Sequence, residues 1–319
     1  MFNAKGLRTG AALATLLVLV ASCADHRLST ESAAPANQPA TPNPSATTSP
    51  IGQLSDEFAG TVINAEWWQS YGVAGSVRQD DRLIVQLLPN SAEPAGLMTS
   101  LPHGLSGSSF AAEISQTAGG TNNTETSISV MTADRAEFVI VSSFGGTLSV
   151  WYKRRGENHR QLGSSITFHA GNHRFRRIRE QAGTIRVEVS ADGTTWTQPS
   201  GWSVASPFAT LGSLYGSIGA RTFDTSNGQP TAAVFEGINT TVPAIPSGVS
   251  GTLTAATQAH LTWQDRSVNE TGFRIERRAS DGAFVEIGTA GSNATQYSDQ
   301  TLAAGTTYEY RVRAFNGQG

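Results

Sequence analysis

The feature that most constrains this chain is an alternation of apolar and polar residues with a period of two. In residues 109–116 (SFAAEISQ) and 184–190 (TIRVEVS), apolar side chains occupy every second position. Successive side chains of a strand point to opposite faces, so each stretch predicts a strand with one buried face. No amphipathic helix of any length is expected beyond the N-terminal segment. The sequence therefore predicts an all-β protein.

Glycine-containing turns separate these expected strands. Gly145-Gly146 divides two β-rich runs and predicts a hairpin, and Asp192-Gly193 predicts a turn that leaves Asp192 beyond its strand. In the run after Gly146, Trp151 falls on the polar face with Ser149 and Lys153, and the aliphatic residues share the opposite face. An aromatic ring on a polar face is a candidate for contact with a ligand.

Composition narrows the class of protein further. Charged residues make up 15% of the chain, below the usual value of about a quarter, and glycine occurs 33 times. Low charge with many small residues is typical of an exported β-protein with tight turns. The net charge of −3 provides no basic field to collect nucleic acid, so no nucleic-acid partner is expected.

The N-terminal segment has the pattern of a secretory signal peptide. Lys5 and Arg8 are followed by an uncharged apolar run at 11–20, which is shorter than the roughly 20 residues of a spanning helix. The stretch Val20 to Cys23 (VASC) resembles a bacterial lipobox. This resemblance implies cleavage of residues 1–22 and attachment of a diacylglycerol to the Cys23 thiol. A plain signal peptide with a chance cysteine is the alternative.

The only cysteine of the chain is thus expected to be a lipid anchor, since a lone cysteine cannot close an intramolecular disulfide. Acylation would hold the protein to a lipid bilayer, in the periplasm or at the cell surface. Ala24 replaces the aspartate that retains many lipoproteins in the inner membrane, which favours the outer membrane. Residues 23–50 are rich in Pro, Ala, Ser and Thr without aromatic residues, and predict a disordered tether.

The next part of the chain, residues 51–243, resembles the concanavalin A-like lectin/glucanase jelly roll. The stretches that carry the resemblance are 56–68 (DEFAGTVINAEWW), 173–197 (HRFRRIREQAGTIRVEVSADGTTWT), 212–224 (GSLYGSIGARTFD) and 232–238 (AAVFEGI). The resemblance implies a two-sheet sandwich, similar to accessory domains of secreted bacterial proteins. No cofactor is expected, apart from a structural calcium of the kind common in this fold. The loop Asp224–Gly228 (DTSNG) would supply its oxygen ligands.

Retaining glucan hydrolases of the same fold carry acids on alternate positions of one strand. The nearest pattern here is 188–192 (EVSAD), in which Ser190 takes the middle position, and 113–117 (EISQT) holds a single acid. Retaining chemistry needs two carboxyl groups about 5 Å apart, so hydrolysis by this domain is not expected. His169 and His173 are four residues apart, but they are interpreted as surface histidines of a loop and not as zinc ligands.

Sugar binding remains possible, because aromatic faces stack on the C–H surface of pyranose rings. The candidate ligand-binding residues are Trp68, Tyr71, Trp151 and Trp202. Each could instead belong to the core, since a sandwich buries aromatic residues on both sheets. Trp196 is expected in the core.

Residues 246–319, after a proline-containing joint, resemble a fibronectin type III immunoglobulin-like sandwich. Trp263 would anchor its core, and Leu302 and Tyr308 would form the corner of the family. Further inward-facing residues are Phe273, Ile275, Tyr310 and Val312. The family continues with one more strand where this sequence stops inside a turn, so the last strand is expected to be missing and the sequence to be a fragment. The alternative is that another segment supplies this strand.

The sequence therefore predicts an exported, lipid-anchored, non-catalytic protein that binds carbohydrate or another cell-surface polymer. Two alternatives stay open. One is a glycan-active hydrolase, with a site unrecognised here or in a missing C-terminal part. The other is a structural surface protein that contacts other proteins. The sequence does not indicate the oligomeric state.

Overall fold

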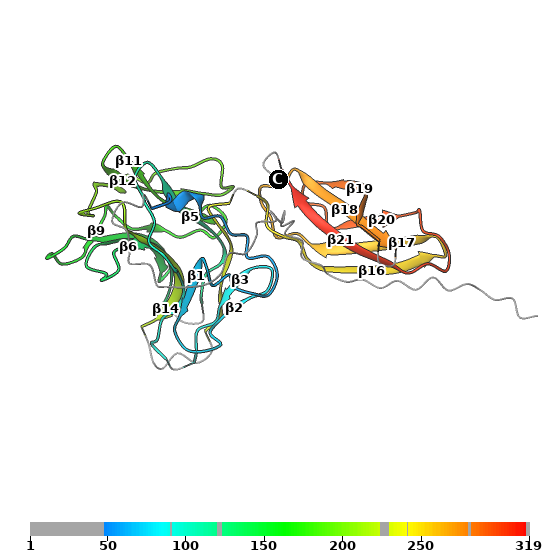
Figure 1. Ribbon diagram of the computed structural model, residues 1–319, viewed down its shortest axis with the longest axis horizontal. Helices are drawn as coiled ribbons and strands as arrows, with labels where there is room; N and C mark the ends of the chain where they lie inside the picture. The colour runs from blue at the N-terminus through cyan, green and yellow to red at the C-terminus, as the bar shows by residue number, and fades with distance from the viewer. Residues whose placement is uncertain are drawn as a thin grey trace, which may run out of the picture. The chain divides into compact units, whose positions relative to one another are not determined.

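The computed structural model describes residues 48–89, 91–119, 123–223, 230–240, 242–279 and 282–316. Within these ranges the chain forms β-strands and one short 3-10 turn, η1 (Ile51–Gln53), so the all-β prediction is confirmed. Two compact units divide between residues 241 and 242 (Figure 1). None of the described residues forms a helix that is long and apolar enough to cross a membrane.

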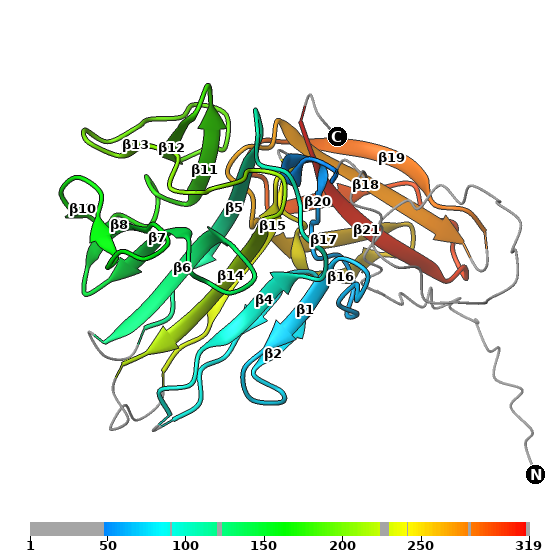
Figure 2. The same cartoon turned by 60° about the vertical axis from the view of Figure 1, so that its left-hand side comes forward.

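The first unit is a sandwich of two antiparallel sheets. We call one the groove sheet. Its order is β1 (Trp68–Tyr71), β4 (Ala95–Thr99), β14 (Tyr215–Thr222), β6 (Thr124–Met131), β7 (Phe138–Phe144), β8 (Thr147–Lys153) and β10 (Ile166–Thr167), with β9 (Arg160–Gln161) also paired to β8. Strands far apart in the sequence are neighbours in this sheet, as a jelly roll requires (Figure 2).

We call the other layer the outer sheet. Its order is β13 (Ser203–Ala205), β12 (Thr184–Ser190), β11 (Phe175–Gln181), β5 (Ser109–Gln116), β15 (Ala233–Ile238), β3 (Leu83–Val85) and β2 (Val77–Gln79). The core lies between the two sheets, because the apolar positions of each alternating strand point inward. Those from the outer sheet include Phe110, Ala112, Ile114, Ile178, Ile185, Val187 and Val189, and those from the groove sheet include Ile128, Val130, Val139, Val141, Leu148 and Val150.

The predicted hairpin joins β7 and β8. Gly145 and Gly146 have φ of 56° and 75°, the left-handed conformations that a two-residue turn requires. The turn after β12 is also where the sequence placed it. Asp192 follows the last strand residue, Ser190, and its carboxylate accepts hydrogen bonds from the backbone N–H groups of Thr194 and Thr195.

One charged side chain crosses the core between the sheets. Arg176 of β11 is fully buried, and its guanidinium donates to the Thr126 carbonyl at 2.9 Å and to the Ser143 hydroxyl at 3.2 Å. Both acceptors belong to the groove sheet. No carboxylate among the described residues pairs with Arg176, and burial lowers the pKa of its guanidinium to about 9. The apolar sandwich therefore contains a positive charge with neutral hydrogen-bond partners.

Trp196 is not in the core, contrary to the sequence prediction. It follows the turn after β12 and lies half-buried, with the Arg177 guanidinium 4.0 Å from the centre of its ring. Its indole N–H donates to the Gly193 carbonyl at 2.9 Å. Arg177 points away from the core on β11, so the ring packs on the outward side of the outer sheet.

The second unit is a smaller sandwich of two three-stranded sheets. One sheet has the order β16 (Ser247–Ala255), β17 (Gln258–Gln264) and β20 (Gln296–Asp299). The other has the order β19 (Val285–Gly291), β18 (Gly272–Ala279) and β21 (Tyr308–Phe315). Its core contains Trp263, Phe273, Ile275, Leu302, Tyr308, Tyr310 and Val312.

The predicted tyrosine corner is formed in this second unit. The Tyr308 hydroxyl accepts a hydrogen bond from the Ala303 backbone N–H at 3.1 Å, and Leu302 beside it is buried. Trp263 packs against Phe273 in the core with 5.4 Å between ring centres. These contacts confirm the roles that the sequence suggested for the tryptophan and the corner.

Candidate functional site

The face of the groove sheet that points away from the core carries a row of small side chains. The strands pair in register, so one position of each strand lines up across the sheet. From β1 to β8 this row is Tyr71, Gly96, Gly219, Ser127, Ser142 and Ser149. Gly219, Ser127, Ser142 and Ser149 form the floor of a groove that runs across the strands, and Gly96 lies beneath Tyr71 at one end of it. Six adjacent strands about 4.8 Å apart make it roughly 24 Å long.

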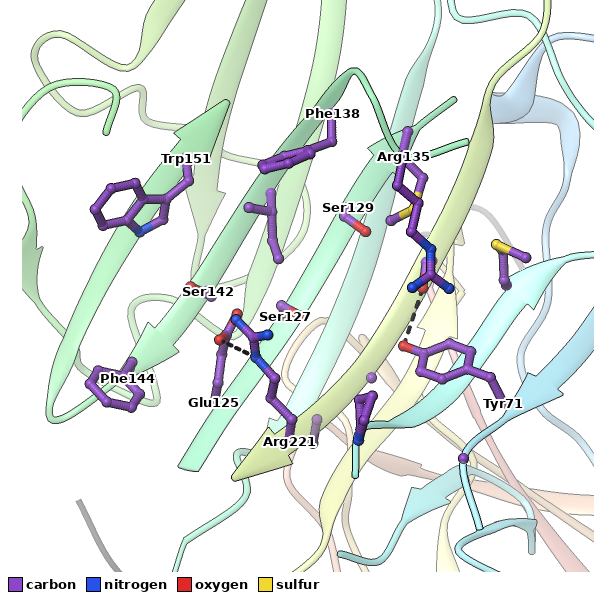
Figure 3. Close-up of a pocket in the computed structure, with 18 of the residues that line it drawn as sticks. Tyr71, Glu125, Ser127, Ser129, Arg135, Phe138, Ser142, Phe144, Trp151 and Arg221 are labelled. Atoms are coloured by element: carbon purple, nitrogen blue, oxygen red, sulfur yellow. Dashed lines mark hydrogen bonds and ion pairs between the residues drawn. The ribbon is translucent and has the colours of Figure 1, made fainter. Parts of the chain in front are cut away.

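Larger side chains rise on both sides of this floor and enclose a volume of about 920 Å³ (Figure 3). We call the two sides the first lip and the second lip. The first lip consists of Glu93, Glu125, Phe144, Arg221 and Phe223. The second lip consists of Met131, Arg135, Phe138, Ile140 and Trp151. A groove with aromatic walls and a floor of hydroxyl groups fits an extended, hydroxylated ligand.

Tyr71 closes one end of the floor. Its ring lies over Gly96 and Gly219, where a Cβ atom on either glycine would collide with the phenolic oxygen. That oxygen is 3.3 Å from both the Ser217 hydroxyl and the Ile218 carbonyl. Burial raises the pKa of the Tyr71 phenol, so the group stays protonated and serves as a hydrogen-bond donor and not as a nucleophile.

A charged and aromatic cluster builds the first lip. The Glu125 carboxylate is buried on β6 and accepts a hydrogen bond from Arg221 Nε of β14 at 2.9 Å. The Arg221 guanidinium also lies 4.1 Å from the centre of the Phe223 ring. Phe223 meets Phe144 edge to face with 5.4 Å between ring centres, and both rings remain more than a third exposed. These two rings therefore keep surface available for a ligand.

Trp151 stands on the second lip, on the polar face of β8 where the sequence placed it. Its ring is partly exposed and meets His159 edge to face at 5.5 Å between ring centres. Ile140 is its partner across the β7–β8 pair. The groove thus contains two of the four aromatic residues proposed from the sequence, Trp151 and Tyr71.

The other two aromatic candidates are core residues, which corrects the sequence expectation for them. Trp202 is fully buried, and its indole N–H donates to the Ser164 carbonyl at 3.0 Å. Trp68 is 2% exposed, and its indole N–H donates to the Asp56 carboxylate at 2.7 Å. Neither ring has a face open to a ligand, because each is packed between the sheets.

The acids singled out in the sequence lie on the opposite side of the sandwich from the groove. Glu188 is held by Arg177 at 2.7 Å and Arg179 at 3.0 Å on the outward face of the outer sheet. Glu113 pairs there with Arg174 at 2.7 Å. In the part of the groove that the structure describes, the acidic lining residues are Glu93 and Glu125. Glu125 is already paired with Arg221, so this lining presents no pair of free carboxyl groups.

Most of the groove lining could not be identified from the sequence. Residues 124–131 of β6 alternate the buried Ile128 and Val130 with Ser127 and Ser129, and this pattern was available to indicate a strand with a polar face. The register between neighbouring strands, in contrast, cannot be read from the sequence. Only the pairing of β4, β14, β6, β7 and β8 brings the glycines and serines of five separate segments into one row.

No cluster of three or more His, Cys, Asp or Glu side chains suited to a metal occurs in the residues that the structure describes. Cys23 and the proposed calcium loop 224–228 lie outside those residues. His169 is exposed, as expected of a surface histidine, whereas His173 is buried, and its ring Nδ1 accepts the His169 backbone N–H at 3.1 Å. Burial lowers the pKa of the His173 imidazole.

The second unit has a clear relation to a known family. The fibronectin type III domain model matches residues 244–319, so the chain contains such a domain after the jelly-roll sandwich. Among curated relatives, the α-amylase of Niallia circulans is 37% identical over 83 residues. That match covers 25% of this chain and 6% of the amylase. Exoglucanase B of Cellulomonas fimi is 31% identical over 102 residues, which are 31% of this chain and 8% of the exoglucanase.

Solved structures superimpose on part of this chain. SCLam, a non-specific endo-β-1,3(4)-glucanase from family GH16, superimposes with a TM-score of 0.45 and 10% identity. That match covers 58% of this chain and 88% of the glucanase. The pseudo β-1,3-glucanase of Mycobacterium tuberculosis superimposes with a TM-score of 0.42 and 12% identity, covering 58% and 96% of the two chains.

Proposed function

We propose that the jelly-roll unit binds a polysaccharide along its groove and does not cleave it. The observation that carries this proposal is the row of glycines and serines across five strands, bordered by aromatic lips. A floor without bulky side chains leaves room for several sugar rings in succession. The relatives with similar segments are named as an amylase, an exoglucanase and a gellan lyase, and these names also connect the chain with glycans.

The chemistry of the lining suits a sugar chain. Pyranose rings present C–H faces that pack on aromatic rings, and Trp151, Phe144 and Phe223 each keep part of a ring exposed to the groove. Sugar hydroxyl groups exchange hydrogen bonds with the serine hydroxyls of the floor and with the guanidinium groups of the lips. Several weak contacts of this kind give binding that improves with the length of the chain.

The charge arrangement argues against cleavage by the groove. Hydrolysis with retention or inversion requires two carboxyl groups on either side of the scissile bond, one of them protonated as the general acid. The buried Glu125 carboxylate instead accepts a hydrogen bond from Arg221 Nε at 2.9 Å, so it is already engaged by a neighbouring side chain. Glu93 precedes β4 on the first lip, the same side of the floor as Glu125, so the two acids do not face each other across it.

The proposal extends to the location of the protein. We propose that Cys23 carries the acyl anchor, that residues 23–50 tether the folded part, and that the fibronectin type III domain is a spacer. These parts rest on the sequence pattern of residues 1–50. They would hold a glycan-binding groove on the outside of a membrane, where polysaccharides are met.

A glycan array combined with a reducing-sugar assay tests the proposal. The full chain should bind one class of polysaccharide on the array and release no reducing ends from it. Binding that is accompanied by release, and that loses release in Glu125→Gln, would establish the hydrolase alternative. A chain that neither binds nor cleaves any glycan but captures a protein would establish the structural alternative.

A further inference from the structure

The loop between β6 and β7 carries Arg135 on the second lip and is fixed by hydrogen bonds. Residues 132–137 connect β6 to β7, and the Asp134 carboxylate fixes the loop from within. It accepts hydrogen bonds from the Thr132 hydroxyl at 2.8 Å and the Ala136 backbone N–H at 3.0 Å. Arg155, just after β8, donates hydrogen bonds to the same carboxylate from two nitrogens, at 2.6 and 3.2 Å. Arg135 therefore projects from a backbone with a defined position.

The backbone of Arg135 itself is in an unusual conformation. Its φ is 54°, in the left-handed region that glycine and asparagine occupy more readily than arginine. The side chain extends from the loop toward the groove, with its guanidinium on the side of Tyr71 (Figure 3). The charge of Arg135 is near enough to oppose the rise that burial causes in the pKa of the Tyr71 phenol.

Arg135 has no acidic partner in the part of the chain that the structure describes. The two acids of its own loop, Asp134 and Glu137, both pair with Arg155, and the groove acid Glu125 pairs with Arg221. Glu93 stands on the first lip, across the floor from the loop that carries Arg135. The guanidinium is thus presented to the groove with its donors unused.

We propose that Arg135 binds an anionic group of the glycan, a uronic-acid carboxylate or a sulfate ester, so that the groove selects acidic polysaccharides. This inference rests on the proposed binding function. A planar guanidinium matches the paired oxygens of a carboxylate or sulfate and binds them with two parallel hydrogen bonds. The unpaired charge of Arg176, buried behind the floor against Thr126 and Ser143, adds to the positive potential at the groove.

The charges of the groove also limit how many acidic units it accepts. Its described lining contains two arginines, Arg135 and Arg221, and two glutamates, Glu93 and Glu125. The lining is therefore close to neutral overall, with the free positive charge on the second lip and the free negative charge on the first. A glycan in which neutral sugars separate the acidic ones avoids Glu93, whereas a polymer of uronic acids alone would place carboxylates against it.

The test compares acidic glycans with matched neutral ones. Hyaluronan, which alternates a uronic acid with a neutral sugar, and polygalacturonate would each be printed beside its carboxyl-reduced form. Chondroitin sulfate would be printed beside its desulfated form, and laminarin would serve as a neutral glucan. We expect the full chain to bind an acidic glycan more than about tenfold better than its neutral form. Loss on carboxyl reduction identifies the carboxylate, and loss on desulfation identifies the sulfate.

Two variants connect this preference with Arg135. Arg135→Asn suits the left-handed backbone, so it should fold at least as stably as the wild type while losing the preference for acidic glycans. Arg78→Asn is the matched control, because it removes an exposed arginine from β2 of the outer sheet. It should keep the preference.

The outcomes separate this inference from the proposed function. Equal binding of acidic and neutral glycans overturns the inference but leaves polysaccharide binding intact. An acidic preference that survives Arg135→Asn also overturns it. A preference for polygalacturonate over hyaluronan overturns the inference that Glu93 disfavours polymers of uronic acids alone. The absence of binding to every glycan overturns both the inference and the function on which it rests.

Discussion

Replacing Trp151 with alanine tests whether this residue contacts the ligand or stabilises the fold. The side chain is partly exposed on the second lip, and its aromatic contact is the edge-to-face pair with His159. A pair of this kind contributes about 0.5–1.5 kcal/mol. We therefore expect Trp151→Ala to lower the free energy of unfolding by about 1 kcal/mol, well below the cost of a buried aromatic residue.

The effect on binding should be larger than the effect on stability. An aromatic side chain at the centre of a binding surface commonly contributes about 2 kcal/mol or more, which corresponds to roughly a thirtyfold loss of affinity. Isothermal titration with the best glycan of the array measures this loss, and urea unfolding of the same sample measures stability. Both measurements use the full chain.

Trp202 provides the matched control for size and chemistry. It is fully buried and its indole N–H is bonded to Ser164, so Trp202→Ala should cost about 3–5 kcal/mol and lower the unfolding midpoint strongly. If Trp151→Ala instead loses stability to the same extent as Trp202→Ala, or keeps full affinity, the assignment of Trp151 to the groove surface is refuted.

Three further predictions concern other parts of the molecule. Cys23→Ser should move the protein from the membrane fraction to the supernatant, and retention in the membrane would contradict the lipid anchor. Arg176→Met should leave the free energy of unfolding unchanged or raise it by about 1–4 kcal/mol, because a buried charge with neutral partners is replaced by an apolar chain; a loss of several kcal/mol in urea unfolding would contradict this. In the fibronectin type III domain, burial opposes ionisation of Asp299, but hydrogen bonds from Thr301, Tyr310 and Arg277 outweigh it and lower the pKa of the carboxyl. The folded-state pKa is depressed, so its stabilisation is present above the unfolded pKa of about 3.9 and is lost as the pH falls through the folded value. The thermal unfolding temperature of this domain should thus fall more steeply below pH 4 in the wild type than in Asp299→Asn. Equal slopes of this temperature against pH would show that the hydrogen-bond network around Asp299 contributes nothing to stability.

The fold was predictable because its signals are local. The alternation in 109–116 and 184–190 and the turn at Gly145-Gly146 each depend on a few adjacent residues. The fibronectin type III domain was recognised in the same way, from Trp263 and the corner at Tyr308. The class of the protein therefore followed from patterns that a single sequence displays.

The groove could be predicted only in part because its lining comes from many segments. Trp151 was found by its position on a polar face, whereas no such pattern showed whether Trp68 and Trp202 are exposed or buried. Nothing in the sequence singled out Arg176, whose contacts with Thr126 and Ser143 place it in the core. Register and the packing of the two sheets decide such cases, and neither is visible in the order of residues.

A bulky side chain in the floor of the groove should block the bound polysaccharide. Ser142 is in the middle of the small-residue floor, and Ser142→Trp would place a large ring where the sugar chain is proposed to lie. Thr184→Trp adds the same ring at the start of β12, away from the groove, as a control. The measurement is the affinity of each variant for the best polysaccharide of the array. We expect loss of binding in Ser142→Trp and wild-type affinity in Thr184→Trp. Undiminished binding in a folded Ser142→Trp would contradict polysaccharide binding along the groove.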